Sequence, residues 1–298
     1  MRTIGILAGL TAAGIWGGMY VVSKIVLDVI PPFLLVSVRL VLGSAFLAIF
    51  LLLKGGFKAT RRQWFQALIV GLIGYGISVG FQFIGTRLST ASNAALVTSA
   101  SPTFIFLFAA WLLKERATWS RVLALVLASL GVIAVIDPRN ASMERALFLG
   151  NMALLVAAVT WGLYSVLVKR VSNELSTLEV SVIVFLGGLP ISVPLAIAEI
   201  TQTGMGQITM PIVLGVLYLG LVSTALAMYL WNKSLALLDA GLVSLLFFAQ
   251  PIVGVGLGAW LLREKLELGF WIGAVLIALG LVISARSGSS FARSEVQV

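Results

Sequence analysis

The chain has 298 residues and a net charge of +9, yet only 10% of its residues are charged and 60% are hydrophobic. A soluble domain carries about a quarter charged residues and could not bury so much apolar side chain, so a soluble globular protein is excluded. Cysteine and histidine are absent. Disulfides, thiolate chemistry, histidine-ligated metals and histidine acid–base catalysis are therefore excluded, and we expect no cofactor, no metal and no enzyme activity.

Apolar runs of about 18–25 residues recur along the chain and predict ten membrane-spanning helices, since about 20 residues cross a bilayer. Helix breakers or charged residues separate the runs, for example Pro31-Pro32 and Lys54-Gly55-Gly56. Residues 286–298 are polar and small, which predicts a disordered cytoplasmic tail. The expected helices span residues 4–27, 33–53, 63–86, 91–113, 119–136, 148–168, 178–199, 210–232, 241–262 and 268–285.

Lysine and arginine are distributed unevenly over the expected loops. With ten helices and the N-terminus inside, 13 of them fall on the inner side and 5 on the outer side, while Lys24 and Arg39 lie within helices. This bias favours both termini in the cytoplasm, in a multi-pass protein of the plasma membrane, the inner membrane of a bacterium. It also accounts for the positive net charge, so we expect the lipid bilayer as a partner and no nucleic acid.

An internal duplication is the most informative pattern. Residues 101–135 align without a gap with residues 250–284, and the first expected helix aligns with the sixth. The offset is 149 in one alignment and 145 in the other, which predicts an insertion in a loop. Matched positions include Pro102 with Pro251, Trp16-Gly17 with Trp161-Gly162, and Ala110-Trp111-Leu112-Leu113 with Ala259-Trp260-Leu261-Leu262.

Each half contains five expected helices, residues 4–136 and 148–285. Because five is odd, the second half must enter the membrane the other way up, which is an inverted repeat. We therefore predict an all-α integral membrane fold of two inverted five-helix repeats. Such symmetry provides two related arrangements, one open to each side, and favours a secondary transporter that works by alternating access. A membrane scaffold or lipid carrier without metabolite flux is the alternative.

Several of these residues resemble a known family. Trp16-Gly17, Lys24, Arg39, Ser99-Ala100-Ser101-Pro102 and the Ala-Trp-Leu-Leu-[Lys/Arg]-Glu-[Lys/Arg] run in each half are similar to EamA-type members of the drug/metabolite transporter superfamily. The resemblance covers residues 4 to about 285 and implies ten helices, two EamA repeats and the export of amino acids or other metabolites. Val184 stands at the position that matches Arg39, so any role of Arg39 is not duplicated.

Two cations within expected helices are candidate site residues. Trp16, Tyr20 and Lys24 are spaced four apart and share one helix face. Lys24 contacts the substrate, snorkels to the interface, or is neutralised by Asp28. Arg39 lies about two turns inside its helix and needs an acceptor. That acceptor is a structural partner, such as Asp28 or a backbone carbonyl, or an anionic ligand.

Pro102 and Pro251 fall near the middle of their helices, where each removes a backbone hydrogen bond. Ser101 and Gln250 stand just before the prolines. Together with the freed carbonyls, they fit either of two interpretations: a binding and hinge region at the membrane midplane, or a simple helix bend whose free carbonyls are hydrogen-bonded locally. The expected substrate is a small polar or amphipathic, amino acid-like metabolite; a monomer and a homodimer both remain open. The predicted binding residues are Trp16, Tyr20, Lys24, Arg39, Ser101, Trp161, Tyr164 and Gln250, with Pro102 and Pro251 as hinges.

Acidic residues are kept out of the expected helix interiors. All eleven lie at helix ends, in loops or in the tail. Glu115 and Glu264 occupy equivalent repeat positions between basic residues, which favours charge balance at the membrane interface over a paired functional role.

Overall fold

The computed structural model describes residues 2–112, 119–136, 145–172, 175–237, 246–247 and 249–294. Helices are the only regular structure in these residues, which confirms the all-helical class. Seven of the helical segments are long and apolar enough to cross a membrane, and Ala249–Leu261 and Leu268–Gly280 are shorter apolar stretches. The first half contains α1 (Arg2–Leu27), α2 (Pro32–Leu53), α3 (Arg61–Gly71), the π-helix η1 (Leu72–Ser78), α4 (Val79–Leu88), α5 (Ala91–Thr98), α6 (Ser101–Leu112) and α7 (Trp119–Ile136).

The second half follows a similar order. It contains α8 (Arg145–Ser172), α9 (Thr177–Thr203), α10 (Met210–Leu217), the π-helix η3 (Tyr218–Leu226), α11 (Ala227–Leu237), α13 (Ala249–Leu261) and α14 (Leu268–Ser294). The α14 helix continues through residues 286–294, where the sequence predicted a disordered tail. The extra residues of this half lie in α9, which has 27 residues against 22 in α2, and not in a loop as expected.

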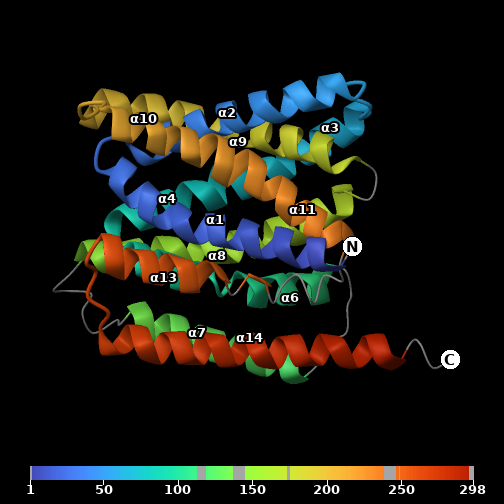
Figure 1. Ribbon diagram of the computed structural model, residues 1–298, viewed down its shortest axis with the longest axis vertical. Coiled ribbons are helices and arrows are strands. Elements are labelled where there is room, and N and C mark those ends of the chain that lie inside the picture. The colour runs from blue at the N-terminus through green and yellow to red at the C-terminus, as the bar shows by residue number, and fades with distance from the viewer. Residues whose placement is uncertain are drawn as a thin grey trace.

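The helices lie side by side in layers (Figure 1). The α7 and α14 helices pack along each other at one edge, and α2 and α9 pack together at the opposite edge. Between them lie α1, α4, α8, α11 and α13, so the centre of the bundle is built from both halves. The start of α1 and the end of α14 lie at the same end of the bundle.

Two Trp-Gly pairs allow close helix contacts in the centre. A Cβ atom on Gly17 of α1 would lie 2.5 Å from the carbonyl oxygen of Gln250 in α13. A Cβ atom on Gly162 of α8 would lie 2.6 Å from the Cβ atom of Phe104 in α6. The glycines thus bring the first helix of each half against a helix of the other half, as small residues commonly do in membrane bundles.

The third expected helix of each half is not a continuous α-helix. The N–H of Val79 donates to the carbonyl of Gly74, and that of Ala227 donates to Val222, each five residues back. These bonds define π-helical segments in the middle of predicted helices 63–86 and 210–232. Because π turns in α-helices frequently mark functional sites, both segments are candidates for contributing to one.

The helix expected at 91–113 is interrupted before Pro102. The α5 helix ends at Thr98 and α6 begins at Ser101. The hydroxyl of Ser101 donates to the carbonyl of Thr98 at 2.6 Å, and the hydroxyl of Ser99 donates to that of Leu96 at 2.6 Å. The carbonyls at the break therefore accept from serine hydroxyls, which satisfies them within the protein.

Glutamates receive the free N–H groups at the starts of neighbouring helices. Glu264 accepts from the backbone of Ala91 at 2.7 Å and Ser92 at 2.9 Å, at the start of α5. Glu199 accepts from Phe33 at 2.7 Å and Leu34 at 3.3 Å, at the start of α2. A carboxylate is favourable there because it meets unpaired donors and the positive end of the helix dipole. Glu264 thus has a specific helix-capping contact beyond interface charge balance; its counterpart Glu115 lies outside the described residues.

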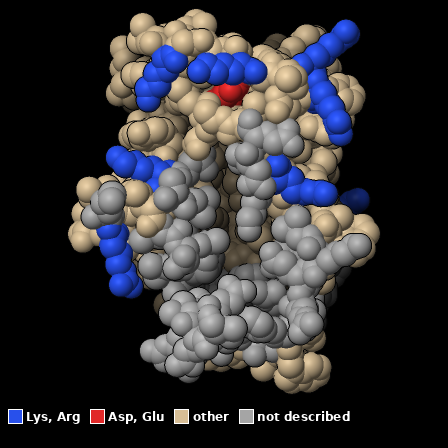
Figure 2. Space-filling view, turned by 90° about the vertical axis from the view of Figure 1, so that its right-hand side faces the viewer, with Lys and Arg blue, Asp and Glu red and all other residues tan. Residues whose placement is uncertain are grey.

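Figure 2 looks onto the end of the bundle at which α1 starts. Lys and Arg side chains lie around a hollow in the middle of this face. Lys54, Lys58, Arg61 and Arg62, at the connection from α2 to α3, are all exposed. The backbone N–H groups of Lys58 and Ala59 donate to the carboxylate of Glu179, at 2.6 and 2.5 Å. These bonds hold the backbone of the loop in place, while its basic side chains stay exposed to solvent.

Candidate functional site

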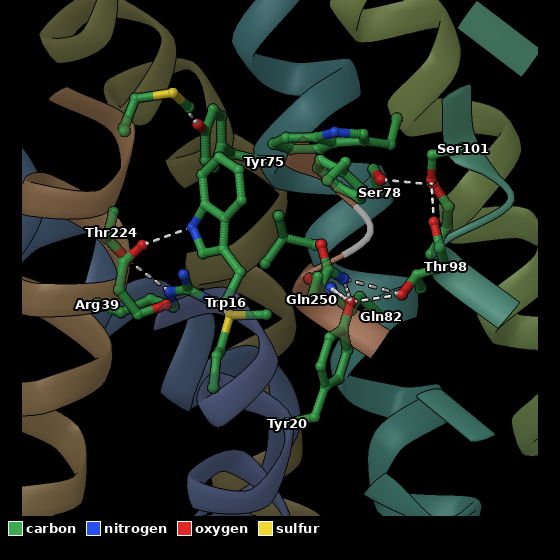
Figure 3. Close-up of a pocket in the computed structure, with 17 residues that line it drawn as sticks. Trp16, Tyr20, Arg39, Tyr75, Ser78, Gln82, Thr98, Ser101, Thr224 and Gln250 are labelled. Atoms are coloured by element: carbon green, nitrogen blue, oxygen red, sulfur yellow. Dashed lines mark hydrogen bonds between the residues drawn. The ribbon is translucent and has the colours of Figure 1, made fainter. Parts of the chain in front are cut away.

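A cavity lies in the centre of the bundle and is lined by both halves (Figure 3). Its empty space, counted together with its open mouth, is about 580 Å³. The two π-helical segments both contribute to its wall. The lining residues are Trp16, Met19, Tyr20, Arg39, Tyr75, Ser78, Val79, Gln82, Thr98, Ser101, Ala157, Trp161, Ser223, Thr224, Met228, Phe247 and Gln250.

The hydroxyl of Tyr20 is the centre of a polar network. It accepts from the amide nitrogens of Gln82 at 2.7 Å and Gln250 at 3.0 Å, and it lies 2.5 Å from the hydroxyl of Thr98. Thr98 donates its own hydrogen to the carbonyl of Ala94 at 2.6 Å, so Tyr20 must be the donor in the Tyr20–Thr98 bond. Four helices, α1, α4, α5 and α13, are joined at this oxygen. The other amide atom of Gln250, Oε1, is buried without a partner among the described residues.

Arg39 is a buried cation beside this network, with only 4% of its surface exposed. Its Nε donates to the hydroxyl of Thr224 at 2.8 Å, and Nη1 lies 3.6 Å from the sulfur of Met19. The guanidinium carbon lies 5.0 Å from the ring centre of Phe83, in a cation–π contact. None of the described residues that line the cavity is acidic. The expected partner Asp28 is exposed and makes no hydrogen bond to Arg39 that would neutralise it.

Aromatic side chains form two groups on the cavity wall. Trp16 packs on Trp231 and Phe247, with ring centres 5.3 and 6.0 Å apart, and its indole N–H donates to the carbonyl of Ser223 at 3.0 Å. Trp161, the matching tryptophan of the second half, has its ring centre 5.9 Å from that of Tyr75 in the first half. The duplicated tryptophans thus each hold an aromatic group against the cavity, which gives it an apolar lining beside its polar network.

Six of the eight predicted binding residues line the cavity, and two do not. Lys24 lies in the last turn of α1, where its ammonium donates to the carbonyls of Arg87 at 2.7 Å and Ser89 at 2.5 Å. Tyr164 lies behind the wall, with its ring centre 4.8 Å from that of Trp161. The six are Trp16, Tyr20, Arg39, Ser101, Trp161 and Gln250, and Pro102 and Pro251 directly follow two of them.

The polar cavity residues that sequence reasoning missed include Gln82, Thr98 and Thr224. Each contacts Tyr20 or Arg39 through its side chain. The available signal was their position, since each is a hydrogen-bonding side chain in the interior of an apolar run. Such side chains in membrane helices face partners or cavities more often than lipid.

The fold and the cavity together define a polytopic membrane protein with a central cavity that its two halves line. The model of the EamA-like transporter family matches the chain twice, over residues 3–136 and 148–286. The chain belongs to this family and is therefore a membrane transporter and not an enzyme.

Relatives named as transporters extend over nearly the whole chain. The "Probable amino-acid metabolite efflux pump" of Salmonella typhimurium is 30% identical over 95% of this chain and 95% of its own, and that of Escherichia coli is 28% identical with the same coverage. The "Uncharacterized transporter YetK" of Bacillus subtilis is 28% identical over 95% of this chain and 87% of its own. A solved crystal structure with 23% identity covers 95% of this chain and 98% of its own, with a TM-score of 0.66, which supports the fold alone.

Proposed function

We propose that the protein is a secondary transporter that exports a small amphipathic, amino acid-like metabolite across the bacterial plasma membrane by alternating access. The observation that carries this proposal is the central cavity, which both halves line with a polar network and an aromatic wall. Two relatives that are 28% and 30% identical are named as amino-acid metabolite efflux pumps, which supports the substrate class.

For the architecture we propose ten membrane helices in two inverted repeats, residues 4–136 and 148–285, with both termini in the cytoplasm. The related Gly17 and Gly162 contacts, the π segments in corresponding helices and the α7–α14 pair support this arrangement. An inverted repeat lets the two halves exchange conformations, and the exchange would open the cavity first to one side and then to the other.

Flux across a membrane that contains only this protein tests the function. The purified protein is reconstituted into liposomes loaded with a panel of amino acids and amino acid derivatives, and efflux is compared with that of protein-free liposomes. We expect efflux of at least one amphipathic member of the panel. A panel without any protein-dependent flux would favour a scaffold or a lipid carrier instead.

Gln250 tests whether the cavity is the binding site. Gln250→Leu removes the amide that reaches Tyr20 at 3.0 Å but keeps the side chain's size, so we expect weaker substrate affinity with near-normal expression. An intramembrane hydrogen bond contributes roughly 0.6–2 kcal/mol, which corresponds to roughly 3–30-fold in affinity. Gln202→Leu, at an exposed position of α9, is the matched control. Unchanged substrate affinity in a well-expressed Gln250→Leu protein would contradict the proposal that the cavity binds the substrate.

A further inference from the structure

Among the residues that the structure describes, the cavity has a positive charge with no negative charge to balance it. Arg39 is buried and its described contacts are a hydroxyl, a thioether and an aromatic ring, none of which is an anion. Thr224 in turn donates to the carbonyl of Leu219, so its hydroxyl is positioned to accept from Arg39. A buried cation without an anionic partner is costly in a membrane protein, and such residues commonly mark a substrate pathway.

Arg39 has more donors than these contacts use. A guanidinium carries five N–H groups, and the described contacts engage one with Thr224 and one with the weakly accepting sulfur of Met19. The side chain lies on the wall of the cavity, beside Trp16 (Figure 3). A carboxylate that enters the cavity could accept two parallel N–H bonds from such a planar group, which is the strongest form of this contact.

The carboxylates that the structure describes are engaged elsewhere or exposed. Glu179, Glu199 and Glu264 each accept two backbone N–H bonds at helix starts or in a loop. Asp28, after the last turn of α1, and Glu267, directly before α14, are exposed. The cavity therefore offers no described carboxylate to a substrate ammonium. What it offers is the neutral Oε1 of Gln250, which is buried and lacks a partner among the described residues.

From this arrangement we propose that the cavity recognises its substrate through a carboxylate bound by Arg39, and that a substrate ammonium is not required. The proposal rests on the proposed transport function and specifies its substrate class: carboxylic acids with an apolar body. The apolar body lies against the walls that contain Trp16 and Trp161. A neutral hydroxyl on the substrate can also donate to the unpartnered Oε1 of Gln250, and the desolvation cost of an ammonium without a carboxylate partner offsets its stronger hydrogen bond.

Three ligands of similar shape test the contributions of the substrate carboxylate and the substrate ammonium separately. L-phenylalanine has both, L-3-phenyllactate keeps the carboxylate and replaces the ammonium by a hydroxyl, and L-phenylalaninamide keeps the ammonium and loses the carboxylate. Binding to the purified protein is followed by intrinsic tryptophan fluorescence, since two tryptophans line the cavity. A parallel series of leucine, 2-hydroxy-4-methylpentanoate and leucinamide covers an aliphatic body.

We expect each hydroxy acid to bind within about threefold of its amino acid, and each amide to bind at least about tenfold more weakly, because a hydrogen bond to a charged group is worth more than a neutral one. Arg39→Gln should abolish the difference between acid and amide, whereas Arg39→Lys should retain a reduced difference. Arg62→Gln, at an exposed position of α3, is the control that removes a positive charge away from the cavity.

Amides that bind as tightly as the acids, or hydroxy acids that bind about tenfold more weakly than the amino acids, would overturn the proposal. So would the absence of binding by every acid of both series. If Arg39→Gln does not fold, the binding of the two ligand series to the wild-type protein and to Arg39→Lys still tests the proposal. Efflux of a non-acidic metabolite in the liposome panel would leave the proposed transport function standing while this inference fails.

Discussion

Gly17 provides a quantitative test of the central helix contact. In Gly17→Ala the new Cβ would lie 2.5 Å from the carbonyl oxygen of Gln250 and 2.9 Å from the Cβ of Val253. Ordinary contact begins at 3.4 Å, so α1 and α13 must separate by about 0.9 Å, the difference between 3.4 and 2.5 Å. Because the atom that it meets is backbone, rotation of a side chain cannot relieve the clash. Overpacking of this kind costs roughly 1–3 kcal/mol.

Gly14 is the matched control because it lies on the same helix, one turn earlier, and a Cβ atom added there would meet no other atom within 4 Å. Gly14→Ala should leave stability unchanged or raise it by up to about 1 kcal/mol, the helix preference of alanine over glycine. We expect Gly17→Ala to unfold in detergent at a clearly lower temperature than Gly14→Ala, as measured by tryptophan fluorescence. Equal midpoints for the two variants would refute the close contact between α1 and α13.

Two further predictions concern the ends of the bundle. Glu264→Gln should lower stability by about 1 kcal/mol, the usual value of a helix cap, because an amide offers one acceptor where the carboxylate serves both Ala91 and Ser92; thermal unfolding in detergent measures it, and an unchanged midpoint would contradict the cap. A single cysteine at Gln207 should react with an impermeant reagent added outside cells, whereas one at Lys58 should react only after permeabilisation, since the chain has no native cysteine; the reverse pattern would invert the proposed topology.

Much of the candidate site could be predicted because the duplication identifies residues that match between the two halves more closely than chance similarity of apolar runs explains. Trp16 and Trp161 match in the sequence alignment, and the structure places both on the cavity wall. Ser101 and Gln250, which precede matched prolines, lie on the same cavity. In a sequence this rich in apolar residues, composition alone would not distinguish one tryptophan from another. The match between the two halves does.

The remaining features depend on contacts between helices that no periodicity encodes. Lys24 shares a helix face with Trp16 and Tyr20, but the end of α4 and the residue that follows it supply the carbonyls that bind its ammonium. Thr224 became part of the site because η3 brings it to Arg39, a residue 185 positions away. Neither partner could be identified without the packing of distant segments.

The two π-helical segments have a consequence for how this chain can vary in length. A π turn holds about one residue more than an α turn, so the removal of one residue from Leu72–Ser78 would restore a regular helix without turning the segments on either side of it. Gln82 would then still face Tyr20, in a chain that is shorter by one residue. The same holds for Tyr218–Leu226 and the residues of α11. In these two stretches the loss of one residue should therefore be tolerated more readily than in a regular helix around the cavity, where it would turn every later residue by about 100°.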